Sequence, residues 1–161
     1  MEKTKAVIIF DLEGTVIDSS TDAPFETIKS VLPELSKNYL LLLWTLRERH
    51  SSIEILKQFD LSQYFVEFYC ADDDFRKPYP SESLKELIEN YSHRFMVGDN
   101  PVDLHAARSL KAHFIAAGWN NEIARNFSKQ GHDQKFSRLP LDGKELIKGI
   151  KELISKGNEN V

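Results

Sequence analysis

The chain has 161 residues, a formal net charge of −4 and 41% hydrophobic residues. This length and composition predict one globular domain with its own core, and the negative charge argues against binding to nucleic acid or anionic membranes, which favour basic surfaces. Cys70 is the only cysteine, which excludes an internal disulfide. Because no apolar stretch approaches the roughly 20 residues of a membrane span, we expect a cytoplasmic protein.

Short apolar runs alternate with segments of helical periodicity along the chain. The runs predict strands buried on both faces at Ala6–Phe10, Tyr39–Trp44, Phe65–Cys70, Phe95–Val97 and His113–Ala117. Helices are predicted from 25 to 35, from a capping box at Ser51 and Glu54, around Leu84–Tyr91, after Asn100-Pro101 and after Asp142. This alternation predicts a three-layer, Rossmann-like α/β domain with a parallel sheet. We expect one domain over residues 1–156 and a frayed tail at 157–161.

An acidic motif, Asp11-Leu12-Glu13-Gly14-Thr15, directly follows the first predicted strand. If the alternation of the strand continues, Asp11 and Glu13 lie on the same side, at the end of the strand where open α/β sheets bind ligands. Two close carboxylates repel each other unless a cation or a shared proton relieves them. The motif therefore predicts either a divalent metal site or an acid beside a nucleophile.

Three more polar residues follow later strands: Thr45 the second, Lys77 in the loop after the third, and Asp99 the fourth. The carboxyl ends of parallel strands meet at one edge of a sheet, so we expect these residues to converge with Asp11. This convergence favours phosphoryl transfer in which Asp11 attacks phosphorus and forms an aspartyl-phosphate.

Each remaining candidate has a role in that reaction. Thr45 would donate a hydrogen bond to the phosphate, and Lys77 would supply positive charge. Asp99, with Asp103 as a second carboxylate, would hold Mg²⁺ through oxygen ligands. Glu13 would protonate the leaving oxygen and then activate water.

Four sequence motifs in this order resemble those of the haloacid dehalogenase-superfamily phosphatases, close to the phosphoglycolate-phosphatase-like branch. They are Asp11–Ser19, Thr45 after an apolar strand, Lys77-Pro78, and Gly98–Asp103. The resemblance covers nearly the whole chain and implies a phosphoric monoester hydrolase with Mg²⁺ as cofactor. The residues that it implies are Asp11 and Glu13 for catalysis, Thr45, Leu46 and Lys77 for phosphate binding, Asp11, Glu13 and Asp99 for the metal, and Asp103 and Asn100 in support.

The chain departs from this family pattern at three places. Glu13 stands where the family usually has Asp, and Leu46 stands where relatives often have a polar residue. There is also no room for a cap domain after the first or the second motif, so we expect an open site. Since caps exclude water and select the substrate, an open site suits a phosphorylated small molecule or a phosphoprotein, and a homo-oligomer would supply a lid near Val16–Ala23.

These departures leave a second interpretation open, in which the chain is a non-catalytic binding or scaffolding module on the same fold. Residues outside the motifs are given structural roles. Basic side chains such as Arg47 and Arg49 are interpreted as solvated helix faces. Trp119 is interpreted as a packing residue that would also be able to touch a substrate.

Overall fold

The protein is described here by a computed structural model that covers residues 6–123 and 136–159. Its centre is a five-stranded parallel sheet of order β3-β2-β1-β4-β5. The strands are β1 (Ala6–Phe10), β2 (Leu40–Trp44), β3 (Glu67–Tyr69), β4 (His93–Gly98) and β5 (His113–Ala116). All five predicted strands are confirmed. Because β1 is central, the loop that begins at Asp11 leaves the sheet between the ends of β2 and β4.

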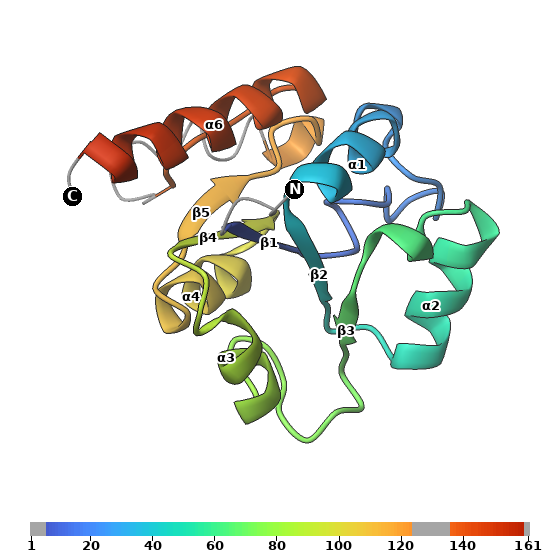
Figure 1. Cartoon of the computed structure of the whole chain (residues 1–161). Coiled ribbons are helices and arrows are strands. Elements are labelled where there is room, and N and C mark those ends of the chain that lie inside the picture. The colour runs from blue at the N-terminus through green and yellow to red at the C-terminus, as the bar shows by residue number, and fades with distance from the viewer. Residues whose placement is uncertain (1–5, 124–135, 160–161) are drawn as a thin grey trace.

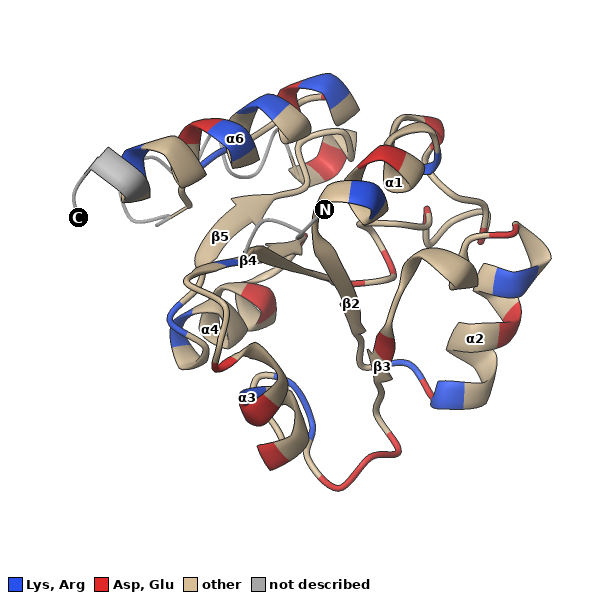
Figure 2. Cartoon of the chain, viewed as in Figure 1, with Lys and Arg blue, Asp and Glu red and all other residues tan. Residues whose placement is uncertain are grey.

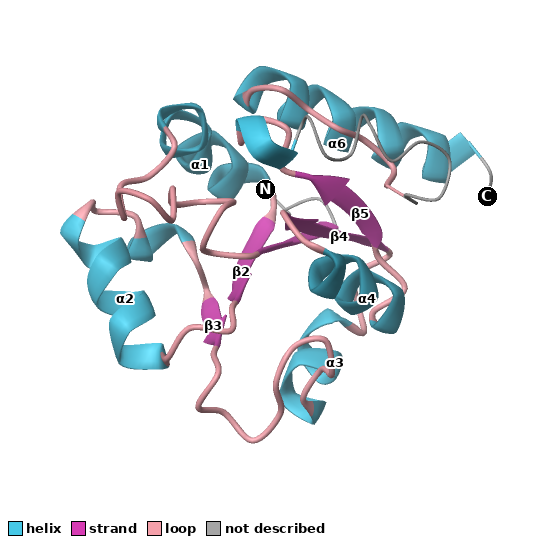
Figure 3. Ribbon diagram, turned by 180° about the vertical axis from the view of Figure 1, so that it is seen from behind, coloured by secondary structure: helices cyan, strands magenta, loops and turns pink. Residues whose placement is uncertain are grey.

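Helices cover both faces of the sheet and complete the predicted three-layer α/β architecture (Figures 1 and 3). They are α1 (Glu26–Asn38), α2 (Arg49–Gln58), the 3-10 turn η1 (Ser62–Tyr64), α3 (Glu82–Ile88), α4 (Pro101–Ser109) and α6 (Gly143–Glu159). One buried cluster joins alternate side chains of β1, such as Ile8, to α1, α2 and α6. The intervening side chains, such as Ile9, pack with α3 and α4.

The charged side chains lie mainly on helices and loops, while β1 and β2 carry none (Figure 2). Every residue of β1 and β2 is buried. A strand that is apolar on both faces requires cover on both faces, which explains why these short runs signal a parallel sheet.

Helix starts agree with the sequence prediction in two cases and differ in one. The side chain of Asn100 caps α4 together with Asp103, and Asp142 accepts a hydrogen bond from the Glu145 amide at 2.9 Å where α6 begins. The capping box predicted at Ser51 is wrong. The helix α2 begins at Arg49, two residues earlier.

The end of α6 falls within the segment 157–161, for which a frayed tail is expected, and this expectation stays a prediction together with the domain bounds 1–156. The helix continues to Glu159, while residues 160–161 lie outside the described part of the chain. An amphipathic face explains this length, because Leu146, Ile150 and Leu153 are buried against the sheet.

No cap domain lies between β1 and β2 or between β2 and β3 in this fold. The segment after β1 folds into a small flap, in which the Phe25 amide donates to the Val16 carbonyl at 3.0 Å and the Asp18 amide to the Ala23 carbonyl at 2.8 Å. The minimal cap predicted from the sequence is therefore confirmed. Among the described residues, none of the helices combines the length and apolar character that a bilayer crossing requires, and the cytoplasmic location stays a prediction.

Candidate active site

The central strand places Asp11 at the rim of the sheet. The Asp11 amide still donates to the Val97 carbonyl of β4 at 2.9 Å. The chain then turns, because the Leu12 carbonyl accepts the amides of Val16 and Ile17 at 2.9 and 3.0 Å. Asp11 therefore remains in register with the sheet, and its side chain is buried.

Lys77 binds Asp11 inside the protein. Its Nζ lies 2.7 Å from Asp11 Oδ1, 2.7 Å from Asp103 Oδ1 and 3.1 Å from the Trp44 carbonyl oxygen. The contact with Asp103 is an ion pair rather than a well-directed hydrogen bond. Burial alone would lower the pKa of Lys77, but Asp11 and Asp103 raise it above its ordinary value. The ammonium group is thus fixed in its charged form beside the candidate nucleophile.

Asp103 is held from two sides at the start of α4. Its Oδ2 accepts the amides of Asp99 and Asn100 at 3.0 and 3.3 Å, while its Oδ1 faces Lys77. Asn100 Oδ1 in turn accepts the amides of Val102 and Asp103 at 2.9 and 3.2 Å. This reciprocal cap ties the end of β4 to Lys77. Asp103 and Asn100 therefore lie where supporting residues would be needed.

Three carboxylates meet at the same place. Asp11, Asp99 and Asp103 each offer an oxygen within 4.8 Å of the other two. Burial and the neighbouring carboxylates raise the pKa of Asp99 to about 9, and burial and Asp11 raise the pKa of Asp103 to about 6, against the opposing charge of Lys77. One lysine does not balance this cluster. Oxygen donors with excess negative charge are the ligand type that Mg²⁺ takes, so the residues present fit a divalent cation.

The hydrogen bonds of the three carboxylates indicate which of them would hold a cation. Both oxygens of Asp103 already have partners, whereas the Asp99 carboxyl group faces the carboxylates of Asp11 and Asp103 and accepts a long 3.3 Å bond from Asn100 Nδ2. A cation would accordingly be held by Asp11 and Asp99, with Asp103 orienting the residues around it. The sequence predicts that Asp11 and Asp99 hold one ion together. Their carboxylate oxygens lie within 4.8 Å of each other, which allows this.

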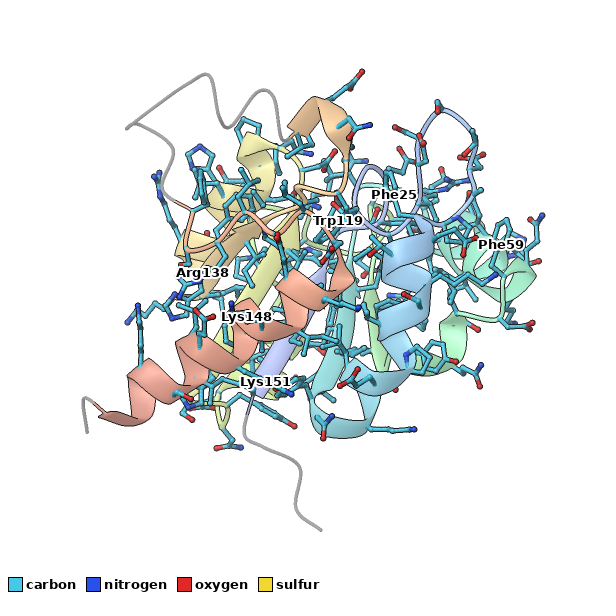
Figure 4. The ribbon with its side chains drawn as sticks, turned by 90° about the horizontal axis from the view of Figure 1, so that it is seen from above. Phe25, Phe59, Trp119, Arg138, Lys148 and Lys151 are labelled. Atoms are coloured by element: carbon cyan, nitrogen blue, oxygen red, sulfur yellow. The ribbon has the colours of Figure 1, made fainter. Side chains whose placement is uncertain are left out.

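Gly14 lets the Asp99 carboxylate approach the turn after Asp11. Gly14 has φ +80°, and a Cβ there would overlap the carboxylate of Asp99. Two residues after β5 hold this turn in place. Trp119 Nε1 donates to the Thr15 carbonyl at 2.8 Å, and Asn120 Nδ2 donates to the Gly14 carbonyl at 3.1 Å. Figure 4 shows Trp119 close to Phe25, near the starts of α1 and α6. Trp119 is therefore a packing residue, as expected, that also supports the active-site turn.

A pocket of about 240 Å³ opens beside Asp11 and Lys77. The lining residues are Asp11, Glu13, Thr45, Leu46, Arg47, Lys77 and Asn100. Thr45 is buried at the end of β2, and its Oγ1 accepts the Arg47 amide at 3.1 Å. The Leu46 side chain is about half exposed at the mouth. All three residues predicted to bind phosphate thus face the pocket that contains Asp11.

Glu13 takes a different position from the one that strand alternation predicts. It lies in the turn after β1, with its side chain about half exposed, and its Oε1 pairs with Arg47 Nη1 at 3.0 Å. Glu13 does not belong to the carboxylate cluster formed by the described residues. Its roles as metal ligand and as general acid–base stay predictions, and the second role requires the carboxylate to turn inward.

Sequence reasoning missed one lining residue. Arg47 was predicted to lie on a solvated helix face, but it lies in the loop between β2 and α2 and lines the pocket. Its position two residues after Thr45, at a predicted strand end, is a signal that would have found it. Arg49 does lie on a helix, and its guanidinium binds Asp73 at 2.9 Å rather than extending freely into solvent.

Comparison with known proteins finds a relative that matches part of this chain. A curated relative from Caldanaerobacter subterraneus subsp. tengcongensis, named "Putative pyrophosphatase PpaX", is 34% identical over 100 residues, which are 59% of this chain and 46% of the relative. The chain thus spans about half the length of that relative.

Solved structures share the fold at lower identity. A "putative phosphoglycolate phosphatase" from Lactobacillus plantarum has a TM-score of 0.69 at 13% identity over 92% of this chain and 100% of its own. A "putative HAD-hydrolase" from Bacillus subtilis, bound to magnesium, has a TM-score of 0.63 at 16% identity over 78% of this chain and 55% of its own. The family model for haloacid dehalogenase-like hydrolases matches residues 21–117. Because this match covers more than half of the chain, the protein belongs to the haloacid dehalogenase-like hydrolase family.

Proposed function

We propose that the protein is a magnesium-dependent phosphatase that hydrolyses a phosphomonoester through an aspartyl-phosphate. The observation that carries this proposal is the contact of Lys77 with Asp11 at 2.7 Å, beside the carboxylates of Asp99 and Asp103. A buried aspartate next to a cation and a metal-type carboxylate cluster is poised to attack phosphorus rather than to accept a proton.

Asp11 and Asp99 would hold Mg²⁺, which supplies charge neutralisation at the phosphoryl oxygens. The excess charge of the cluster supports this assignment. Thr45 and Lys77 line the same pocket and would bind the phosphoryl oxygens from the protein side. Positioning and charge stabilisation are the main requirements of phosphoryl transfer, and these residues offer both.

The proposed reaction has two steps. In the first, an oxygen of Asp11 bonds to phosphorus, the bond from phosphorus to the leaving oxygen breaks, and Glu13, which takes up a proton from solvent when it leaves Arg47, gives that proton to the leaving oxygen. In the second, Glu13 takes a proton from water, whose oxygen bonds to phosphorus as the bond to Asp11 breaks. Inorganic phosphate leaves, and the Asp11 carboxylate and the protonated Glu13 are restored.

The open pocket sets the class of substrate. With no cap above it, the site suits a phosphorylated small molecule or an exposed phosphorylated residue of a protein. The curated relative named as a pyrophosphatase makes phosphoanhydrides worth including in a substrate panel. If a homo-oligomer forms, we propose that its interface covers the flap at 16–23. A monomer at micromolar concentration in analytical ultracentrifugation would contradict this proposal.

The outward position of Glu13 favours a second candidate function, a non-catalytic binding module. Calorimetry with Mg²⁺ and beryllium fluoride, a phosphoryl mimic, separates the two. Binding that requires Asp11 supports the enzyme, whereas no binding by the wild type supports the module.

The main test is hydrolysis of an aryl phosphate with and without Mg²⁺ by the wild type and by Asp11→Asn. Loss of the nucleophile should lower kcat by about 1,000-fold or more, with the fold preserved in circular dichroism. Asp60→Asn is the matched control, because Asp60 is exposed and far from the pocket in the fold. Equal turnover by wild type and Asp11→Asn would refute the mechanism.

A further inference from the structure

The pocket has two cations among its lining residues, and they differ in availability. The Lys77 side chain is 1% exposed and already contacts two carboxylates and a carbonyl. The Arg47 side chain is 22% exposed and lies at the mouth. Lys77 is thus held at the centre of the site beside the place of the reacting phosphoryl group, whereas Arg47 at the mouth is accessible to a second group of the ligand.

Arg47 is fixed at one end of its guanidinium and exchangeable at the other. Nε donates to Ser51 Oγ at 2.7 Å, which directs the planar group across the mouth. Nη1 lies 3.0 Å from Glu13 Oε1 and 3.7 Å from Asp22 Oδ1. Both carboxylates are substantially exposed, and pairs of this kind contribute about 0–1 kcal/mol, so a ligand anion can replace either one.

The ion pair between Glu13 and Arg47 also spans the entrance of the pocket. Glu13 belongs to the turn after β1, while Arg47 follows β2, so their contact joins two loops on either side of the pocket. The Arg47 amide additionally donates to Thr45 Oγ1. The backbone of Arg47 is therefore anchored to the residue that would bind the phosphoryl group, and both side chains line the same pocket of about 240 Å³, so only a short ligand is needed to reach both.

We propose that Arg47 determines specificity by binding a second anionic group of the substrate, in exchange for Glu13. The ligand class is a short phosphate ester or anhydride with a carboxylate or a second phosphoryl group close to the reacting phosphorus. Arginine binds both groups through paired N–H donors. The exchange frees the Glu13 carboxyl group to turn toward the leaving oxygen. This inference rests on the proposed function, but its test does not require turnover.

The test measures binding of non-hydrolysable phosphonates by calorimetry in excess Mg²⁺. The probes are 3-phosphonopropionate, ethylenediphosphonate and propylphosphonate, which carry a carboxylate, a second phosphonate and no second anion. The first two distinguish the sources of the second anion, and the third is the comparison that lacks a second anionic group. We expect wild type to bind at least one of the first two probes roughly 10- to 100-fold more tightly than propylphosphonate, as charge-assisted hydrogen bonds imply.

Four variants locate the effect. In Arg47→Met the preference should fall to near one, while Arg49→Met, at a neighbouring arginine paired with Asp73 outside the pocket, should keep it. In Glu13→Gln the preferred probe with a second anionic group should bind several-fold more tightly, because its competitor for Arg47 has lost its charge. Arg47→Lys should keep part of the preference through charge alone.

Two results would overturn the proposal: a wild-type preference near one, or a preference that survives in Arg47→Met. Weaker binding of the probes with a second anionic group by Glu13→Gln would remove the exchange with Glu13. If wild type binds with this preference but hydrolyses no phosphate ester, the proposed function fails while the assignment of Arg47 stands.

Discussion

The inner and outer parts of the pocket are both built from ion pairs, yet they differ in burial and in purpose. Inside, Lys77 joins Asp11 and Asp103 with almost no exposed surface. Outside, Arg47 joins Glu13 with solvent on both partners. Burial makes the inner group a fixed framework, since an unpaired buried charge is costly. Exposure makes the outer pair replaceable. The same chemistry thus builds a rigid centre and an adaptable mouth.

The largest expected effect on this contrast comes from removing the positive charge of Lys77 and, for comparison, that of Arg47. Lys77→Met leaves two buried carboxylates without their partner and should lower the free energy of unfolding by about 3–5 kcal/mol. Arg47→Met, the matched variant at the mouth, should lower it by less than about 1 kcal/mol. Urea denaturation of both variants measures the difference. Equal losses would show that burial does not separate the two parts of the pocket.

A smaller change in the inner part is Gly14→Ala. The new Cβ would collide with Asp99, and the positive φ would also be strained, so we expect a loss of about 1–3 kcal/mol and weaker Mg²⁺ binding in calorimetry. Gly149→Ala, within α6, places its Cβ 3.2 Å from the flexible Arg138 side chain and should be neutral or stabilising by up to about 1 kcal/mol. Normal Mg²⁺ affinity in Gly14→Ala would contradict the proposed role of Asp99.

A third test of the inner part of the pocket concerns pH. The pKa of Asp99 is raised to about 9 in the folded protein, whereas an unfolded aspartate titrates near pH ~4. The folded state therefore keeps a proton that the unfolded state has released, and stability without metal should fall as pH rises through this window. Thermal denaturation in EDTA across pH 5–9 measures the fall, which Mg²⁺ should reduce and Asp99→Asn should flatten. A melting temperature that rises with pH in EDTA would contradict it.

The sequence predicted the strands better than the helix boundaries and the side-chain contacts, because strands buried on both faces appear in the sequence as short apolar runs. Each strand was found, and the order of the motifs placed Asp11, Thr45, Lys77 and Asp99 at one rim. Helix boundaries were less certain. Ser51 failed as a cap because its hydroxyl accepts from Arg47 instead, a contact between side chains that no local pattern reports.

The position of the Glu13 side chain could not be predicted from the sequence pattern. Its predicted place beside Asp11 assumed that the strand continues, but β1 ends at Phe10 and the chain turns at once. Arg47 was overlooked for a related reason, since a charged residue near a helix is usually solvated. Both errors involve the same ion pair, which depends on the relative position of two loops and not on the sequence of either one.

The two hydrogen bonds beneath the turn at Gly14 and Thr15 have a consequence for how the site assembles. Trp119 and Asn120 follow these residues by more than a hundred positions, and closing so long a loop is slow and entropically unfavourable. The candidate nucleophile, Asp11, emerges before β5 during synthesis, yet its loop gains this support only after β5 has joined the sheet. The complete candidate site should consequently be among the last parts of the fold to form.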